Sequence, residues 1–598
     1  MTNLNLLVLK EVQKAFKESF GTDIDEKDVV IQPTRKEFEG SHTIVCFGLA
    51  RFSKKNPEET GKVLGEYLKN QSEYFRDFNV VKGFLNLSLT YSTWLKLIAE
   101  ISADDHFGYS EKSNKEIMVE YSSPNTNKPL HLGHLRNIFL GWSVSKLYEA
   151  IGYDVHKVQI INDRGIHICK SMIAWLKFGN GETPQSKGVK GDKFVGDYYV
   201  KFDQEYKKEI QHLMEGGMSS EEAEKSTAIL GEAQDLLLKW EDKDPEVYSL
   251  WEKMNGWVYE GFNVTYDTMG VTFDKLYYES QTYLLGKDVI QKGLEKGVFY
   301  KKEDGSVWVD LTDEGLDEKL LLRSDGTSVY MTQDIGTAIM RFNEFPNIEK
   351  QVYTVGNEQE YHFKVLFLIL AKLGYSWAKE CYHLSYGMVD LPSGKMKSRE
   401  GTVVDADELM DEVIEKAREK TMELGKIDEM DSEQSEKLFY SLGLGALKYY
   451  LLRVDPKKRM LFNPEESVDL QGNTGPFIQY THARISSLLR KADERNIPYR
   501  DIQWEGITSL EATEQDLIYQ ISIFPQKIEE AAMEYSPSIV AQYVYDLSKE
   551  FNKFWQTIII LQEEDEELRK MRIIISGTVA SIIRKSLNML GIDAPNRM

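Results

Sequence analysis

Cysteine is scarce in this chain of 598 residues, and its three cysteines lie far apart, at Cys46, Cys169 and Cys381. They support neither a disulfide framework nor a zinc site built from cysteine, so we expect a cytoplasmic protein in a reducing compartment. No apolar run reaches the length of a membrane span, and no membrane partner is predicted. Residues 1–20 have the pattern of an amphipathic helix and lack the basic start of a signal peptide.

Positive charge is also in short supply, because 96 acidic residues outnumber 73 lysines and arginines and leave a formal net charge of −23 at pH 7. This balance argues against non-specific binding of nucleic acid, although a local basic face would still allow RNA to bind. Part of the acidic excess lies in blocks such as residues 563–567, which are typical of solvated helix surface.

Strand and helix patterns alternate in the middle of the chain, which predicts an α/β fold with a Rossmann-type parallel sheet. We expect an N-terminal α/β module at residues 1–110, the Rossmann-type domain at 111–455 with an insertion at about 179–245, and a C-terminal all-α helical bundle at 456–598. The clearest helices of the bundle are expected at roughly 473–495, 514–534, 537–560 and 567–590.

The stretch EYSSPNTNKPLHLGHLRN, which starts at Glu120, joins a strand-like run to an amphipathic helix. His131 and His134 are three positions apart, so on a helix both imidazoles point to the same side. The free N–H groups of a helix N-terminus favour a phosphate, and Gly133 would let a flat group approach the backbone. Metal ligation is the alternative, but no cysteine or carboxylate stands at a supporting spacing, so we expect no protein-bound structural metal.

A cationic stretch lies at residues 394–401, where Lys395, Lys397 and Arg399 stand between two glycines. Such a loop can clamp a triphosphate and stabilise the charge that develops on a leaving pyrophosphate. Taken alone, a solvated basic turn explains the same residues equally well. The phosphate role is favoured because HLGH lies upstream in the same alternating domain.

Together these two stretches resemble the HIGH and KMSKS signatures of class I aminoacyl-tRNA synthetases. HLGH alone would indicate only the wider group of nucleotidyltransferases, but longer segments resemble the arginyl-tRNA synthetase family, in order from about residue 83 to residue 598. These segments are SSPNTNKPLHLGHLRN, INDRGIHICKSM, SDGTSVYMTQDIGTA, YTVGNEQEYHF, GKMKSREGTVV, GNTGPFIQYTHARISSLLRK and LGIDAPNRM.

The resemblance implies an enzyme, an arginine–tRNA ligase that uses ATP with Mg²⁺ and forms AMP and pyrophosphate. The carboxylate of arginine would attack the α-phosphate of ATP, and the 2′-hydroxyl of the terminal adenosine of tRNA(Arg) would then take the arginyl group. The implied partners are tRNA(Arg), L-arginine and ATP, and we expect a monomer. Neither step needs a protein nucleophile, so such a site works by orientation and charge stabilisation.

The two signatures carry the residues implied for ATP. The sequence KMKSR at Lys395–Arg399 lacks the second lysine of KMSKS, and both Lys128, just before HLGH, and Lys397 are candidates to replace it. The resemblance implies catalytic roles for His131, His134, Lys128 and Lys395, and ATP contacts for His131, Gly133, His134, Lys395, Met396, Lys397, Ser398 and Arg399.

A pocket selective for arginine needs a fixed carboxylate and further acceptors in the plane of the guanidinium. Tyr330 and Asp334 match guanidinium-binding positions of the family and are four apart, so they share a face if that stretch is helical. The structural alternatives are core packing of Tyr330, a helix N-cap at Asp334 and a capping partner at Gln359. The full implied set for arginine is Glu120, Ser123, Asn125, His134, Tyr330, Asp334 and Gln359.

Asn162, Asp163 and Arg164 directly follow a predicted strand at 155–161. In a parallel sheet this places them at the edge where ligands bind. An Asx turn followed by a surface arginine explains them equally well.

RNA contacts are implied at both ends of the chain. Phe84 and Asn86 match positions where the family's N-terminal domain reads a D-loop base, although Asn86 could equally be an ordinary residue of an edge strand. The C-terminal region resembles the family's anticodon-binding domain and offers Tyr480, Arg484, Tyr545 and Trp555 for stacking on bases. The core of a helical bundle is the alternative explanation for these aromatic residues.

Three other functions fit parts of the sequence. A class I synthetase for another amino acid is disfavoured because a cationic substrate explains Tyr330 and Asp334. A nucleotidyltransferase for small molecules would need neither the helical tail nor the N-terminal module. An RNA-binding relative without activity is disfavoured by the intact His131, His134 and Lys395.

Overall fold

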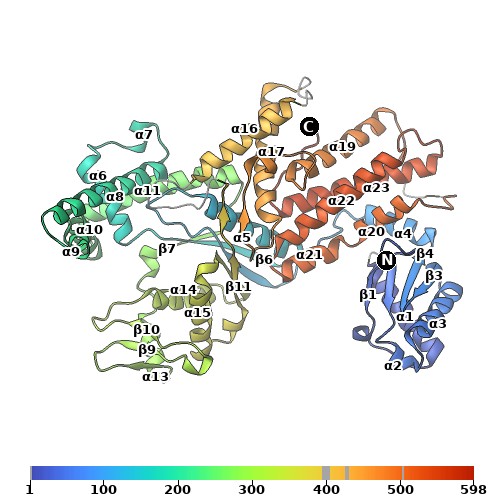
Figure 1. The fold of residues 1–598 in the computed structure, drawn as a ribbon, viewed down its shortest axis with the longest axis horizontal. Coiled ribbons are helices and arrows are strands. Elements are labelled where there is room, and N and C mark those ends of the chain that lie inside the picture. Colours follow the sequence, from blue (N-terminus) through green and yellow to red (C-terminus); the bar gives the residue numbers. More distant parts are fainter. Residues whose placement is uncertain (1–2, 393–403, 424–429, 501–503, 505) are drawn as a thin grey trace.

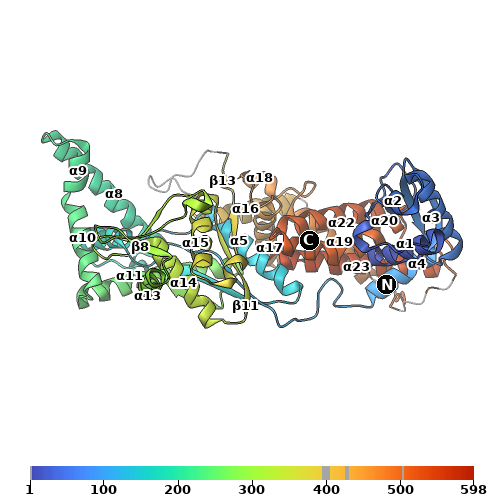
Figure 2. The ribbon, with the colours of Figure 1, turned by 90° about the horizontal axis from the view of Figure 1, so that it is seen from below.

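The computed structural model describes residues 3–392, 404–423, 430–500, 504 and 506–598 (Figure 1). The molecule is elongated, with a group of insertion helices at one end and the N-terminal module at the other (Figure 2). Among the described residues, no helix combines the length and the apolar character needed to cross a membrane.

The N-terminal module is a four-stranded antiparallel sheet with helices packed against it, in strand order β1-β2-β4-β3. Its sheet is formed by β1 (Ile31–Pro33), β2 (His42–Val45), β3 (Phe75–Val81) and β4 (Phe84–Leu89). Its helices are α1 (Leu4–Phe20), α2 (Ala50–Ser53) and α3 (Pro57–Gln71), and α4 (Tyr91–Ser102) leads out of the module.

The central domain is built on a five-stranded parallel sheet in the order β12-β11-β5-β6-β7. The strands are β5 (Glu116–Glu120), β6 (Asp154–Ile161), β7 (Lys275–Tyr278), β11 (Ile348–Gly356) and β12 (Cys381–Tyr386). Because β5, β6 and β7 follow each other to one side while β11 and β12 lie on the other, the strand order reverses between β5 and β11. Ligands of such sheets bind at this switch point, outside the carboxyl ends of the strands.

Helices cover both faces of the sheet, as a parallel sheet requires. They are α5 (Leu132–Ala150), α6 (Ile166–Phe178), α14 (Tyr330–Glu344) and α15 (Glu360–Lys372). Side chains of β5 alternate between two hydrophobic clusters, since Ile117 and Val119 pack with α5 and the C-terminal helices whereas Met118 packs with α14 and α15. This alternation follows from the two-residue period of a strand.

Smaller elements follow β7. They are α12 (Glu279–Thr282), α13 (Lys287–Glu295) and an antiparallel sheet of β8 (Phe299–Lys301), β9 (Val307–Val309) and β10 (Lys319–Leu322). A short parallel pair of β13 (Val389–Asp390) and β14 (Met460–Leu461) lies beyond β12.

Between α6 and β7 the chain forms a helical insertion, which extends to one end of the molecule in Figure 2. Its helices are α7 (Pro184–Lys187), α8 (Gly191–Glu215), α9 (Ser220–Ser226), α10 (Ala228–Glu241) and α11 (Pro245–Met269).

Among its described residues, the C-terminal part is helical apart from β14. It comprises α16 (Ala406–Glu423), α17 (Ser432–Leu452), α18 (Pro464–Ser467), α19 (Gly475–Glu494), α20 (Ala512–Ser522), α21 (Phe524–Met533), α22 (Pro537–Thr557) and α23 (Glu566–Met589). The prediction of one helix over 514–534 was wrong, because the chain breaks at Ile523 between α20 and α21. Pro525 explains the break, since it lies in the first turn of α21 and has no N–H to continue α20.

The predicted α/β class is confirmed, with a Rossmann-type parallel sheet and a C-terminal helical bundle. The boundaries proposed for the three domains and for the insertion remain predictions.

Candidate active site

The turn after β5 is held by contacts from both sides of the switch point. Ser122 and Ser123 take the left-handed backbone conformation, with φ of 78° and 43°. The Ser122 N–H donates to Asn137 Oδ1 over 2.6 Å, and Asn137 Nδ2 donates to the carbonyl of Thr354 in β11 over 2.6 Å. Asn137 of α5 therefore ties the strained turn to the neighbouring strand.

His131 and His134 open α5 together, as their spacing predicts. His131 is the N-cap residue, and its Nδ1 accepts a hydrogen bond of 3.1 Å from the Gly133 N–H. His134 Nδ1 accepts one of 3.1 Å from the His131 N–H, and the two ring centroids are 3.9 Å apart. A Cβ at Gly133 would lie only 3.0 Å from His131 Cε1, so glycine lets the first ring fold back over the helix start.

Both imidazoles are neutral at pH 7. Burial, reinforced by the charge of Lys128, lowers the pKa of His131 from 6.5 to about 4. Burial and the neighbouring His131 lower the pKa of His134 well below its ordinary value. Because each Nδ1 accepts from a backbone N–H, each neutral ring carries its proton on Nε2 and offers that N–H as a donor.

Lys128 lies partly buried beside this pair, and burial lowers the pKa of its ammonium. Helix α8 packs on the backbone here, since a Cβ at Gly196 would lie 2.8 Å from Pro129 Cδ. The predicted ATP residues Lys395, Met396, Lys397, Ser398 and Arg399 lie outside the described residues. Beyond them, Asp405 forms a β-bridge with His131, and the Ala406 N–H donates to the Leu130 carbonyl over 2.9 Å.

The first turn of α14 presents the two residues predicted for the guanidinium. Tyr330 is 76% exposed, so the alternative of core packing is excluded. Asp334 follows one turn later, and Val329 occupies the N-cap position, so Asp334 is not the N-cap. Gln359 is exposed at the N-cap position of α15, after β11, and makes no side-chain cap bond.

Glu120, at the end of β5, is buried and forms an ion pair with Arg341. Arg341 comes from the same helix as Asp334, and its guanidinium also lies 4.7 Å from the ring centroid of Tyr277. The other Glu120 oxygen accepts a hydrogen bond of 3.3 Å from Ser123. Glu120 thus anchors α14 to the sheet, whereas Asn125 in the following turn is exposed.

A carboxylate that the sequence reasoning missed, Glu279, begins α12 directly after β7. Burial raises its pKa to about 7, Arg164 opposes that rise, and the charges of Asp163 and Asp334 add to it. Helix α12 packs against α14, which carries Asp334, so the two acids lie within electrostatic range of each other. A glutamate directly after a strand of a parallel sheet was the available signal.

Asp163 is a structural residue. Its carboxylate accepts hydrogen bonds from the Ser280 N–H at 2.8 Å, the Ser280 hydroxyl at 2.7 Å and the Tyr259 hydroxyl at 3.0 Å. Arg164 lies 4.0 Å from Glu279 and 3.0 Å from Glu241 of the insertion. This pair of residues fixes the start of α12 at the ligand edge of the sheet.

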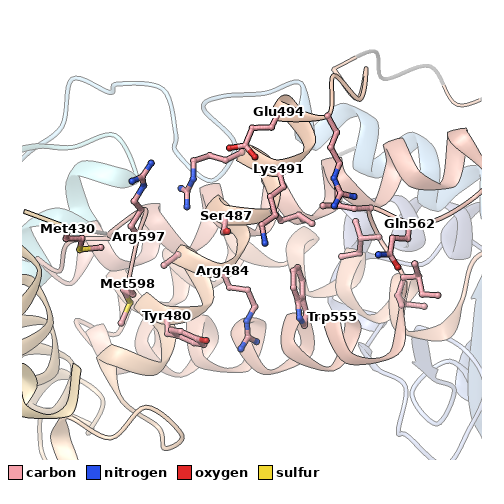
Figure 3. Close-up of a pocket in the computed structure, with 18 residues that line it drawn as sticks. Met430, Tyr480, Arg484, Ser487, Lys491, Glu494, Trp555, Gln562, Arg597 and Met598 are labelled. Carbon is pink, nitrogen blue, oxygen red and sulfur yellow. The ribbon is translucent and has the colours of Figure 1, made fainter. Parts of the chain in front are cut away.

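The residues predicted for RNA belong to the C-terminal helices and to the N-terminal module. Tyr480, Arg484 and Trp555 line a cavity of about 1020 Å³ between α19 and the end of α22, together with Lys491 and Arg597 (Figure 3). The Arg484 guanidinium lies 4.9 Å from the Tyr480 ring centroid and 5.8 Å from that of Trp555. Tyr545 lies outside this lining, and its ring packs 5.5 Å from Phe477.

In the N-terminal module, Asn86 is buried. Its side chain accepts from Thr43 over 2.6 Å and donates to Asn79 over 2.7 Å. Phe84 is half-buried with its ring edge against Phe47, which is 52% exposed. Of the two rings in contact, that of Phe47 is the more exposed. The RNA roles of Phe84 and Asn86 stay predictions.

Comparison with known proteins covers nearly the whole chain. The catalytic-domain model of the class I tRNA synthetases (R) matches residues 97–463, the DALR anticodon binding domain matches 478–598, and the arginyl tRNA synthetase N terminal domain matches 6–89. The arginine–tRNA ligase of Amoebophilus asiaticus (strain 5a2) is 54% identical over 597 residues, which is 100% of both chains. That of Bacteroides thetaiotaomicron is 54% identical over 593 residues and 99% of both chains.

The fold has a counterpart in the solved arginyl-tRNA synthetase of Thermus thermophilus. The two structures superpose with a TM-score of 0.76 at 22% identity, over 99% of each chain. At 22% identity, the structural similarity shows a shared fold only, whereas the sequence matches above establish family membership. The chain belongs to the arginyl-tRNA synthetase family of class I tRNA synthetases.

Proposed function

We propose that this chain activates L-arginine with Mg-ATP to arginyl-adenylate and transfers the arginyl group to the 2′-hydroxyl of the terminal adenosine of tRNA(Arg). One observation carries the proposal. The carboxyl ends of neighbouring parallel strands lead into the segments that hold His131, Arg164, Glu279 and Gln359. The phosphate-binding candidates thus share one edge of one sheet with Glu279, and Asp334 lies on α14, which packs against α12 and α15 at that edge.

At the start of α5, ATP would bind to hydrogen-bond donors and to one ammonium group. Neutral His131 and His134 donate from Nε2 to phosphate oxygens, and the positive end of the α5 dipole adds to the attraction for phosphate. Lys128 supplies positive charge as negative charge builds on the leaving pyrophosphate. Mg²⁺ enters with ATP and neutralises part of the phosphate charge. Lys395 and its neighbours stay in this proposal on the sequence resemblance.

Arginine is selected by charge and by shape. Asp334 and Glu279 supply acceptors for the guanidinium, and the exposed ring of Tyr330 can stack on its plane. Without the guanidinium, acceptor oxygens of these two carboxylates are left without a ligand donor, so apolar amino acids are rejected. Ser123, Asn125, His134 and Gln359 are left for the amino-acid end of the substrate.

The cavity lined by Tyr480, Arg484 and Trp555 is the proposed site for anticodon bases. Its aromatic rings offer stacking surfaces, and Arg484, Lys491 and Arg597 offer charge for phosphates. This local basic face would allow RNA to bind although the net charge of −23 is unfavourable for RNA. We also propose a cytoplasmic monomer, because the substrates ATP and tRNA are found in that compartment and one chain carries all the proposed contacts.

An ATP–pyrophosphate exchange assay over all amino acids, with and without tRNA, tests this function. We expect exchange with arginine only, and only when tRNA is present, as family membership implies. Exchange with a different amino acid, or none under any condition, would overturn the proposal.

A further inference from the structure

His362 lies against the carboxylate that the proposed function gives to the guanidinium. Its Nε2 is 2.6 Å from Asp334 Oδ2, across the contact between α15 and α14. The His362 side chain is 27% exposed and that of Asp334 is 41% exposed, so both can be reached from solvent. None of the functional predictions from sequence uses this histidine.

The pair leaves one carboxylate oxygen open. A guanidinium that binds a carboxylate in the two-pronged manner needs both oxygens, but Oδ2 is already engaged by His362. Among the described residues no other side chain hydrogen-bonds to Asp334, so Oδ1 is left for a ligand. Glu279, which is near enough to sense the charge of Asp334, can then supply the second acceptor.

The protonation of His362 decides what charge a ligand meets. When the imidazole is neutral, its Nε2–H donates to Asp334 and the pair keeps one negative charge. When the imidazole is protonated, the pair is neutral overall, and an arriving guanidinium stands beside an imidazolium of the same sign.

We propose that His362 is a positioning residue of the arginine pocket, which in its neutral form turns Asp334 Oδ1 toward the guanidinium and in its protonated form weakens arginine binding. The inference rests on the proposed role of Asp334. Arginine binding to the protonated form then requires that His362 release its proton to solvent. Arginine affinity should therefore fall when a decrease in pH protonates His362.

Other ionisable groups lie on the elements around this pair. They are His383 on β12, Glu358 before α15, Glu360 and Tyr361 on α15, Lys319 on β10 near Tyr361, and Glu279 on α12 near Asp334. Burial lowers the pKa of His383, and its Nε2–H donates to the Val355 carbonyl over 3.0 Å, so this ring favours its neutral form. Protonation of Glu279 also weakens arginine binding, so an experiment must separate these two groups.

His362→Gln separates them, because glutamine keeps a donor for Asp334 but cannot titrate. Arginine dissociation constants would be measured by calorimetry on the full chain at pH 5.5 and pH 8.0, with ATP binding as a check on folding. We expect the wild-type affinity to fall about fivefold between pH 8.0 and pH 5.5. His362→Gln should retain the affinity at pH 8.0 and lose most of this pH dependence, whereas Glu279→Gln should keep the part due to His362.

His156→Gln is the matched control. His156 lies 2.8 Å from Glu116 in a similar histidine–carboxylate pair, but at the opposite end of the sheet, where β5 begins. This variant should follow the wild-type pH profile.

Two outcomes can be told apart. If Asp334→Ala leaves the arginine dissociation constant unchanged, the proposed role of Asp334 fails and the role of His362 fails with it. If Asp334→Ala weakens arginine binding while His362→Gln keeps the full wild-type pH dependence, the inference about His362 alone is overturned. Proton release on arginine binding, measured in buffers of different ionisation enthalpy, should decrease in His362→Gln and keep only the part due to Glu279.

Discussion

At the scale of single residues, buried imidazoles set the chemistry at the start of α5. His131 and His134 are neutral at physiological pH, so they offer donors and not charges to a phosphate. Positive charge beside them comes from Lys128 and from the N-terminus of the helix. This division explains how two histidines can lie 3.9 Å apart without repelling each other.

His42 is another buried imidazole, and its lowered pKa makes the stability of the fold depend on pH. It is 1% exposed, its ring lies edge-on to Tyr519 of α20, and burial lowers its pKa from 6.5 to about 4. As pH falls below 6.5 the unfolded chain takes up the proton first, so the folded state loses stability progressively until about pH 4. We expect this group to contribute a loss of about 2 kcal/mol at pH 5 relative to neutral pH.

Urea unfolding at pH 7.5 and pH 5.0 measures this loss. His42→Gln removes the titration and should lose about 2 kcal/mol less than the wild type over that range. The exposed His106, changed to glutamine, is the control and should behave like the wild type. Equal acid sensitivity of all three proteins would contradict the assignment.

Some residue arrangements follow from spacing within one helix, whereas others depend on contacts between distant elements. The shared face of Tyr330 and Asp334 and the paired rings of His131 and His134 follow from helical spacing, so the sequence is enough to predict them. The Glu120–Arg341 and Asp334–His362 pairs join different elements, and no spacing in the sequence brings these partners together.

At the scale of elements, α8 of the insertion braces the start of α16 against the segment before His131. Lys190 contacts Asp407 of α16 and also lies 2.6 Å from Thr265 and 3.2 Å from the buried Asp192. Burial raises the pKa of Asp192 to about 6 despite the charge of Lys190. Because Gly196 of the same helix packs on Pro129, α8 links the two segments.

Lys190→Met should therefore do more than remove a surface charge. Two carboxylates would be left without their shared cation, and we expect unfolding to become easier by about 2 kcal/mol, between the values for exposed and buried ion pairs. The KM for ATP should rise more than the KM for arginine, because the brace touches the ATP side of the pocket.

Lys201→Met is the control on the same helix, where Lys201 pairs with Glu205 at the surface over 2.8 Å. It should change the stability by about 0.5 kcal/mol or less. Equal effects of the two substitutions on stability and on KM for ATP would show that α8 does not link α16 to the segment before His131.

Among the elements, the alternating sheet and the later helices could be predicted because their periods are visible over many residues. The break between α20 and α21 was missed although Pro525 marks it, since the apolar spacing continues across the break. The brace could not be predicted, because Lys190 and Asp407 are 217 positions apart.

At the scale of the whole molecule, the C-terminal tail connects the proposed RNA cavity to α5. Arg597 and Met598 line the cavity, and the His482 ring contacts the Pro595 carbonyl at 2.9 Å. Further back in the tail, Gly591 lies against Trp142 of α5, where a Cβ would be 3.1 Å from that ring. The sequence LGIDAPNRM marks the tail by resemblance, but only the fold shows what it joins.

The central claim is that the carboxylate of Asp334, beside the carboxyl edge of the parallel sheet, selects arginine. The substitution Asp334→Ala tests this claim most directly. Dissociation constants for arginine and for ATP would be measured side by side, with the exposed Asp313→Ala as the control. We predict that arginine binding weakens about a hundredfold, as expected for loss of a charged partner, while ATP binding and the control stay near wild type. Equal losses for both ligands, or no loss for arginine, would contradict the account.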